Sequence, residues 1–486
     1  MPLKGVFVCL KMFGKEGKIF KVIIGKTGVF MSGVQKNSHI RDFTEGNITK
    51  QLVVFSLPLF MSNLLQIVYN MVDMIIVGQA LGKEGISAVS VGGDVSHFMT
   101  FVAMGFANAG QVLIAKYIGA KRQDKIGRFV GTMSGFLFSC ALVISTVAVI
   151  FQDTILNLMN TPAESYQGAA SYSFVCMIGL VFIYGYNIVS AVLRGMGDSK
   201  HPFVFISLAA VLNLVLDVVF VLGFKMGPGG AALATVISQG VSFVSCGVFL
   251  VKNKDKFSLD ITVKDFINWD KTMLADLLKL GTPMAIKSAS IQISKLFVNS
   301  WINSYGVAVS AFAGIANKVA SVSNLVSNAM NTAGSTMVSQ NIAAGKFSRV
   351  KKIMLSIAAI GLSIALIISF VFIAFPTQIF SIFTGDTAVL EIGSRYVPVA
   401  VMLFFGSAMR AIMNALINGS GNYKINFATA ILDGIVLRIG LSVLFGLYLG
   451  MQHYGFWLGD ALAGFTPFFI GLVFYLSGRW KRAYKE

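Results

Sequence analysis

The sequence predicts an all-α polytopic membrane protein with twelve transmembrane helices in two pseudo-symmetric six-helix lobes. Three observations support this fold class: the composition, the spacing of the apolar runs and an internal repeat. Of the 486 residues, 55% are hydrophobic and 12% are charged, and the mean hydropathy is +0.75, which no water-soluble domain of this size would show. Apolar runs of helical length recur along the chain, whereas a transmembrane barrel would show short alternating strands.

The apolar runs predict twelve membrane helices, six in each half of the chain. Their approximate spans are 52–80, 86–115, 130–151, 169–193, 203–224 and 230–251, then 275–303, 307–341, 353–375, 393–417, 425–448 and 454–477. Some spans exceed the length that ~30 Å of hydrocarbon requires, so we expect those helices to tilt, bend or project into water.

The positions of the basic residues test this count independently. The formal net charge is +18, and the basic clusters fall in every second loop, as the positive-inside rule requires. The predicted outer loops hold only three basic residues, Lys83, Lys225 and Arg395. Both termini are therefore predicted to be cytoplasmic, in a multi-pass protein of the plasma (inner) membrane. The basic clusters are interpreted as orientation signals, so we expect the lipid bilayer and no nucleic acid as a partner.

The two halves of the chain resemble each other. A shift of about 224 residues lays LRGMGDSK (193–200) over INGSGNYK (417–424) and pairs Gly82 with Gly306. Each half has an even number of helices, so the halves run in the same sense across the membrane and are related by an axis along its normal. This arrangement predicts a cavity between two lobes.

The predicted domain organisation follows from the helices and the repeat. It comprises a basic N-terminal segment (1–50), an N-lobe (51–251), a cytoplasmic linker (252–274), a C-lobe (275–478) and a basic C-terminal tail (479–486). Two interpretations of the lysine-rich residues 1–30 stay open: an amphipathic anchor on an anionic membrane surface, or a stretch upstream of a true start at Met31. No cleavable signal peptide is expected, because lysines interrupt the short apolar stretches.

Acidic residues inside predicted membrane helices mark the candidate site. The N-lobe keeps Asp73 and Asp217, with Asp94 near the start of its second helix. A carboxylate at the bilayer centre costs roughly 2.5 to 3.5 kcal/mol on insertion scales, so it is rarely retained without a use. The positions that the repeat pairs with Asp73 and Asp217 are Val298 and Leu441. The acidic pair thus belongs to one lobe, which we expect to be the cation-handling lobe.

Neighbouring polar residues extend this candidate cation site. Asn213 lies four residues before Asp217, so both side chains point the same way from one helix. Thr235 and Asn187, on other predicted helices, could add oxygen ligands. If the two aspartates face each other, they cannot both stay ionised cheaply, so the pair could hold a proton or, with the other oxygens, Na⁺. The structural alternative is that these aspartates are hydrogen-bonded contacts between helices.

The helix that carries Asp73 contains a predicted hinge. Pro58, about four turns before Asp73, removes one backbone hydrogen-bond donor and is expected to let the helix bend. Gln66 shares the face of Asp73 and supplies an amide to the same polar patch.

The C-lobe keeps a different set of charges, five cations and two acids. They are Lys287, Lys295, Lys318, Arg410, Arg438, Asp433 and Asp460. Snorkelling, or pairing of Arg410 or Arg438 with Asp433, is as good an interpretation of the cations as a role in substrate binding.

Other chemistry has little support in the sequence. His39, His97, His201 and His453 are scattered without metal-binding motifs, and no Walker loop is present. The isolated cysteines Cys9, Cys140, Cys176 and Cys246 are interpreted as small core residues. We therefore expect no enzymatic activity, no cofactor and no metal beyond a possible Na⁺.

Three segments resemble a known family. PLFMSNLLQIVYNMVDMIIVGQALG (58–82), LRGMGDSKHP (193–202), and LNLVLDVVF (212–220) followed by GPGGAALATVISQ (227–239) look like segments of the MATE (multidrug and toxic compound extrusion) transporters. The resemblance implies a V-shaped two-lobe exporter, functioning as a monomer, that exchanges H⁺ or Na⁺ for amphipathic, often cationic, drugs by alternating access.

The resemblance also implies roles for particular residues. In prokaryotic members with an acidic site in the first lobe, the positions matching Asp73, Asn213, Asp217 and Thr235 form the cation site, and Asn187 is a further match. Gln66, Tyr69 and Tyr172 look like its neighbours and are candidates to line the substrate cavity. Two other functions stay open: a flippase for lipid-linked precursors of the same wider superfamily, for which Lys287, Lys295, Lys318 and Arg410 could bind pyrophosphate, and a non-transporting receptor.

Overall fold

The structure is a computed structural model that describes residues 40–159 and 161–482. The predictions for residues 1–30, for Met31 and for Cys9 and His39 lie outside these residues. The helices of the first half and the linker are α3 (Ile48–Gly119), α4 (Ile126–Ile150), α5 (Gln152–Leu158), α6 (Ala163–Ile178), α7 (Leu180–Gly195), α8 (Lys200–Asp217), α9 (Gly227–Lys252) and α10 (Val263–Ile267). Those of the second half are α11 (Lys271–Asn303), α12 (Val307–Ala343), α13 (Phe347–Ala374), α14 (Pro376–Ser381), α15 (Thr387–Gly419), α16 (Tyr423–Ile431), α17 (Leu437–Val443), α18 (Gln452–Ala463) and α19 (Thr466–Leu476).

The helices account for the twelve predicted membrane spans. Among the described residues, eight helical segments are long and apolar enough to cross a membrane, and the pair α6 and α7, bent by 49°, makes a ninth. The long helix α3 holds two spans, because the chain reverses at Gly82, whose φ of 65° and ψ of −157° are not helical. Adding α11 and α12, which are long enough but more polar, gives twelve. The predicted fold class is confirmed.

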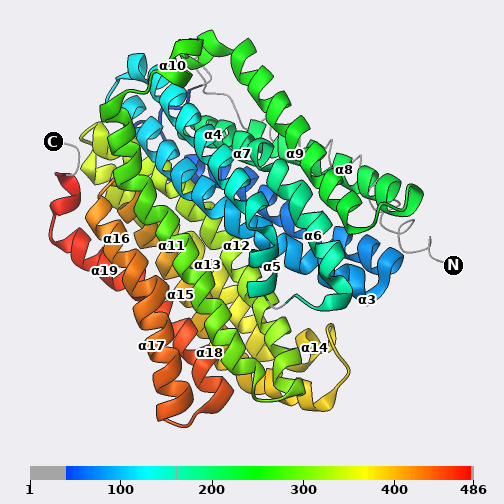
Figure 1. Cartoon of the computed structure of the whole chain (residues 1–486). Coiled ribbons are helices and arrows are strands. Elements are labelled where there is room, and N and C mark those ends of the chain that lie inside the picture. The colour runs from blue at the N-terminus through cyan, green and yellow to red at the C-terminus, as the bar shows by residue number, and fades with distance from the viewer. Residues whose placement is uncertain (1–39, 160, 483–486) are drawn as a thin grey trace, which may run out of the picture.

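The internal repeat is visible in the backbone. Gly82 and Gly306, which follow equivalent helices, both have positive φ, at 65° and 108°. Gly197 and Gly421, the aligned glycines of the repeated loop motif, also have positive φ, at 86° and 68°. This left-handed region is accessible to glycine at little steric cost, which explains why the motif keeps glycine in both halves. The two six-helix bundles are coloured blue to green and green to red in Figure 1.

The linker between the two halves of the chain lies against the N-lobe. The linker carries α10, whose start is capped because Asp265 accepts hydrogen bonds from the backbone and hydroxyl of Thr262. These bonds hold the pKa of Asp265 below its ordinary value. Arg128 at the start of α4 pairs with Asp270 at a nitrogen–oxygen distance of 3.3 Å. The linker is thereby fixed to the N-lobe.

The lobes contact each other at the ends of the helices that carry the basic loops, which we call the basic face. There, Gln111 of α3 donates from Nε2 to the hydroxyl of Thr336 of α12 at 2.7 Å. One turn further along, Ser339 donates to the carbonyl of Val112 at 2.8 Å. Gly119 leaves no room for a Cβ beside the backbone of Gln340. The described conformation is therefore closed on the basic face.

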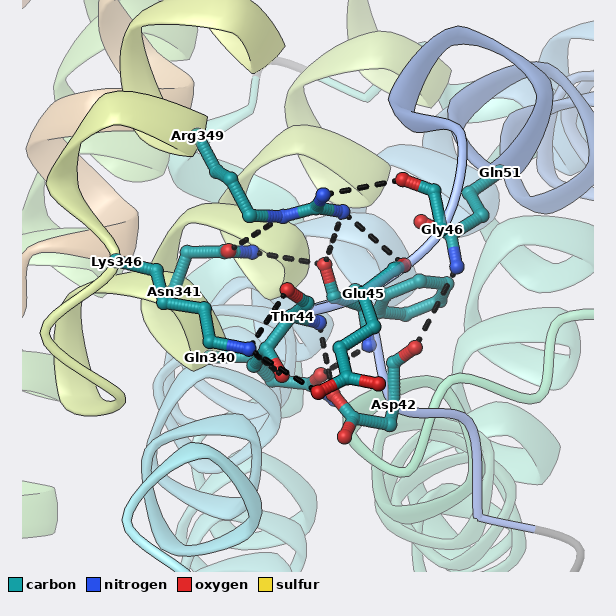
Figure 2. A network of polar contacts seen from close by, with 10 residues as sticks. Asp42, Thr44, Glu45, Gly46, Gln51, Gln340, Asn341, Lys346 and Arg349 are labelled. Atoms are coloured by element: carbon teal, nitrogen blue, oxygen red, sulfur yellow. Dashed lines mark hydrogen bonds and ion pairs between the residues drawn. The ribbon is translucent and has the colours of Figure 1, made fainter.

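Residues 40–47, which we call the strap, seal this contact from the side (Figure 2). The backbone N–H of Arg41 donates to the carbonyl of Met196 in the N-lobe at 3.0 Å. Two residues later, the N–H of Phe43 donates to Oε1 of Gln340 in the C-lobe at 2.9 Å, and Nε2 of Gln340 donates back to the carbonyl of Arg41 at 3.1 Å. The strap therefore bonds to both lobes.

A single arginine holds most of the strap against the C-lobe. Arg349 of α13 donates to the carbonyl oxygens of Phe43, Glu45 and Gly46 at 3.0 to 3.1 Å. Lys346 adds hydrogen bonds to the carbonyl and hydroxyl of Thr44 at 3.1 and 3.2 Å. Guanidinium and ammonium donors make charge-assisted hydrogen bonds, which are stronger than those between neutral groups. Closure of the basic face thus depends on a discrete set of polar contacts.

Candidate functional site

Asp73 and Asp217, which come from different helices, meet inside the N-lobe. Asp73 lies on the first span of α3 and is 8% exposed, and Asp217 is the last residue of α8 and is 1% exposed. Their carboxyl groups are close enough for one to donate a hydrogen bond to the other when one of them is protonated. The structure therefore brings the two predicted acids together.

The carboxylate oxygens of this pair lack other partners. One oxygen of Asp73 and both oxygens of Asp217 are buried and accept no hydrogen bond from the described residues. Two ionised carboxylates are both acceptors, so neither can satisfy the other without an added proton or cation. Because an unsatisfied buried charge is costly, the arrangement calls for a cationic species between or beside the two groups.

The backbone around Asp217 is also irregular. Helix α8 ends at Asp217 and continues as a π-helical turn, Val218–Gly223. In the C-lobe, Asp433 lies in a π-helical turn as well, Leu432–Val436. π-Helical turns are rare in proteins, and those that occur are often found at functional sites.

A small pocket lies about one helical turn from the pair, because two of its lining residues, Tyr69 and Asn213, precede Asp73 and Asp217 by four residues on the same helices. It has an empty volume of about 210 Å³ and is lined by Tyr69, Ile206, Ala209, Ala210, Asn213, Thr235, Ser238 and Gln239. Nδ2 of Asn213 donates to the hydroxyl of Thr235 at 3.4 Å, so these two predicted ligands are neighbours. The amide oxygen of Asn213 and the hydroxyl of Thr235 are ligand types that suit Na⁺ as well as water.

Two lining residues, Ser238 and Gln239, were not predicted from the sequence. The hydroxyl of Ser238 is buried and has no hydrogen-bond partner among the described residues. The signal for both was the helical spacing from Thr235, because residues three and four positions along a helix share a face. They are additional candidates for the polar lining of the site.

The remaining predicted residues differ in their relation to the pair. Tyr69 and Tyr172 are within electrostatic range of both aspartates. Gln66 is half-buried on α3. Nδ2 of Asn187 donates to the carbonyl of Ile183 in its own helix at 2.8 Å. This bond does not use Oδ1, the atom that would bind a cation, so the role of Asn187 stays a prediction. Helix α3 runs through Pro58 with helical dihedral angles, and the role of Pro58 as a hinge stays a prediction.

The C-lobe has an ionic cluster of its own. Arg438 bonds to both remaining acids: its NH2 group lies 2.9 Å from Oδ1 of Asp433, and its NH1 group contacts Asp460. Arg438 and Asp433 are 2% and 0% exposed. Arg410 forms no ion pair with Asp433; it donates to Oδ1 of Asn324 at 2.7 Å. Of the two pairings considered from the sequence, the structure has the one made by Arg438.

The duplicated twelve-helix bundle, with two acids buried in one lobe, defines a polytopic membrane transporter. The MatE family model matches residues 58–219 and 283–444, one copy in each lobe. The chain is 31% identical over 448 residues to the probable multidrug resistance protein YoeA of Bacillus subtilis, which covers 90% of this chain and 95% of that one. The chain belongs to the MatE family.

More distant relatives and solved structures agree with this assignment. The multidrug export protein MepA of Staphylococcus aureus is 24% identical over 419 residues, which cover 85% of this chain and 91% of MepA. The fold is similar to that of a MOP superfamily transporter from Pyrococcus furiosus, with a TM-score of 0.85, 22% identity and coverage of 92% and 99%. It is also similar to MATE in the straight conformation, with a TM-score of 0.82, 22% identity and coverage of 93% and 100%.

Proposed function

We propose that the protein is a secondary active exporter that exchanges H⁺ or Na⁺ for amphipathic small molecules by alternating access. The observation that carries this proposal is the buried pair Asp73 and Asp217, whose oxygens lack partners. The names of its relatives, a probable multidrug resistance protein and a multidrug export protein, support drugs as substrates. No enzymatic step and no cofactor are part of the proposed cycle.

The proposed cycle begins with the basic face closed, as the strap and the α3–α12 contacts hold it. A cation enters from the opposite face and binds between Asp73 and Asp217. Neutralising the pair changes how α3 packs, Pro58 supplies the bend, and the substrate is released outward. The lobes then close on the opposite face, the strap contacts break, and the cation leaves through the basic face.

The direction of transport follows from the proposed orientation. The basic loops place the basic face in the cytoplasm of a cell whose interior is negative, by the positive-inside rule. Each unit charge that moves inward across 100 mV releases about 2.3 kcal/mol, enough for a concentration ratio approaching fifty. We further propose that one chain, in the plasma membrane, is the functional unit, because the site lies within one lobe.

The experiment that tests this proposal is efflux from proteoliposomes under an imposed gradient. Purified protein is reconstituted with ethidium inside, and the outside is made acidic or given Na⁺ while the inside is not. Ethidium fluorescence is expected to fall faster under one of these two gradients than without a gradient, and the effective gradient identifies the coupling ion. If vesicles that retain the protein lose ethidium at the same rate under a proton gradient, under a Na⁺ gradient and without a gradient, the proposed exchange is refuted.

A further inference from the structure

A cluster of cations lies inside the C-lobe, whereas the N-lobe has a pair of acids. Lys287 and Lys295 project from α11, and Arg410 projects from α15, all well within predicted membrane spans. Each is half-buried. Charges at this depth are rarely kept unless they are paired or line a polar cavity. The partners of these three side chains therefore decide what they can bind.

The carboxylates near this cluster are already engaged. Asp433 and Asp460 both bond to Arg438, which lies between them. The charges that act on Lys287, Lys295 and Arg410 come from one another or from Arg438, Asp433 and Asp460. Four cations and two carboxylates leave a net charge of +2 in the interior of this lobe.

The three cations have neutral partners or none of their own. Nζ of Lys287 donates to Oδ1 of Asn414 at 2.8 Å. Arg410 donates through one nitrogen to Asn324 at 2.7 Å and to the hydroxyl of Ser407 at 3.2 Å. Within the described residues, no hydrogen bond or ion pair to the ammonium of Lys295 is found. An amide oxygen positions a cation but does not neutralise it, so the excess positive charge remains available.

We propose that Lys287, Lys295 and Arg410 bind an acidic group, a carboxylate or a phosphate, on the amphipathic molecule that the protein transports. The proposal rests on the proposed export function and specifies its substrate class. The guanidinium of Arg410 has a flat edge of donors that suits the two oxygens of such a group. The two ammonium groups add charge without fixed geometry, which allows acids of different shape to bind.

The proposal gives the two lobes opposite tasks. The N-lobe pair is anionic and takes the coupling cation, whereas the C-lobe cluster is cationic and takes the acidic end of the substrate. Arg438 is excluded from the binding set, because it is buried with Asp433 and is needed to neutralise both Asp433 and the partly buried Asp460. The predicted substrates thus include acidic amphiphiles, in addition to the cationic drugs that the family resemblance suggests.

The test measures binding without transport. Protein in nanodiscs of phosphatidylcholine is titrated with dansyl-aminoundecanoic acid, with its methyl ester and with the corresponding amine. The acid is expected to bind about tenfold more tightly than the ester, because one hydrogen bond to a charged group changes the affinity by about this factor. Changing Lys287→Gln and Arg410→Gln together should remove that preference. Equal affinity for acid and ester, or tightest binding of the amine, would overturn the proposal.

Matched variants distinguish a loss of binding at this site from the effects of a changed overall charge or of misfolding. Lys318→Gln removes one cation from an exposed position of α12 and should leave the acid-over-ester preference unchanged. Lys295→Gln removes a cation that has no hydrogen bond to lose and should lower the preference several-fold. Arg410→Lys keeps the charge and should retain part of the preference. A loss caused equally by Lys318→Gln would show that no local site exists.

Two further measurements distinguish a lipid ligand from a soluble one, and separate the acidic-substrate proposal from the proposed ion exchange. Nanodiscs containing phosphatidylglycerol should weaken probe binding if the natural ligand is a lipid phosphate, and leave it unchanged if the ligand is a soluble acid. Asp73→Asn protein should still prefer the acid. Failure of gradient-driven efflux together with this preference would refute ion exchange alone, whereas efflux of ethidium without any acid preference would refute the acidic-substrate proposal alone.

Discussion

Replacing Asp73 by asparagine is expected to abolish cation-driven efflux while the protein still inserts in the membrane. An amide has nearly the same size as a carboxylic acid, but it neither takes up a proton in this pH range nor contributes a negative charge to a Na⁺ site. Because the buried oxygens of Asp73 and Asp217 lack other partners, removing one charge removes the reason for a cation to bind. Efflux from proteoliposomes should fall to the rate of protein-free vesicles.

The controls for this prediction come from the same helices. Asp217→Asn should have the same effect as Asp73→Asn, and the double variant should be no worse than either, since both acids act on one cation. Glu84→Gln, at an exposed position of α3 beyond Gly82, should transport normally. Gradient-driven efflux by the double variant at the wild-type rate would show that the acidic pair is not the coupling site.

Replacing Arg438 by methionine is expected to destabilise the C-lobe more than any single change to the acidic pair. The substitution leaves Asp433, which is 0% exposed, and Asp460 without their shared cation. Removing one member of a buried ion pair typically costs about 3 to 5 kcal/mol, because the remaining charge stays buried and uncompensated. Thermal unfolding of the purified protein in detergent should show a large loss of stability.

Neutralising the whole cluster is the matched control. The triple variant Arg438→Met, Asp433→Asn and Asp460→Asn removes all three charges and should recover much of the lost stability, since apolar or neutral replacements of buried ion clusters are often tolerated. A triple variant less stable than Arg438→Met alone would contradict this explanation. Wild-type stability in the Arg438→Met protein would contradict it as well.

Most of the fold could be predicted from sequence because its determinants are local. Apolar runs of membrane length fix the helices, and repeated glycines at positive φ, such as Gly197 and Gly421, mark equivalent turns. Asn213 and Asp217 could be assigned to one face by helical spacing alone. These features depend on a few neighbouring residues, so no knowledge of the tertiary structure is needed.

Features that depend on packing between distant segments were less accessible. The two hydrogen-bond partners that join the strap to Gln340 are about 300 residues away in sequence, and no periodic pattern signals such a contact. The role of Asn187 stays a prediction, because the hydrogen bond to its own helix uses Nδ2 and not the amide oxygen that would bind a cation. Ser238 was overlooked, although it shares a face with Thr235. The rotation of each helix about its axis, which decides these cases, is set by packing rather than by local sequence.

The central claim is that a cation at Asp73 and Asp217 decides which face of the protein is open. The measurement that tests it most directly is the distance between spin labels across each face, in a variant whose four natural cysteines are alanine. Labels at Arg122 and Lys352 report on the basic face, and labels at Glu164 and Thr387 report on the opposite face. All four positions are exposed, so labelling should leave the core intact.

We expect the two label distances to change in opposite directions when the pH is lowered or Na⁺ is added, and the change to vanish when Asp73→Asn and Asp217→Asn are introduced. A response to the cation that persists in the absence of both carboxylates would contradict the account, as would distances in the wild-type background that ignore the cation altogether.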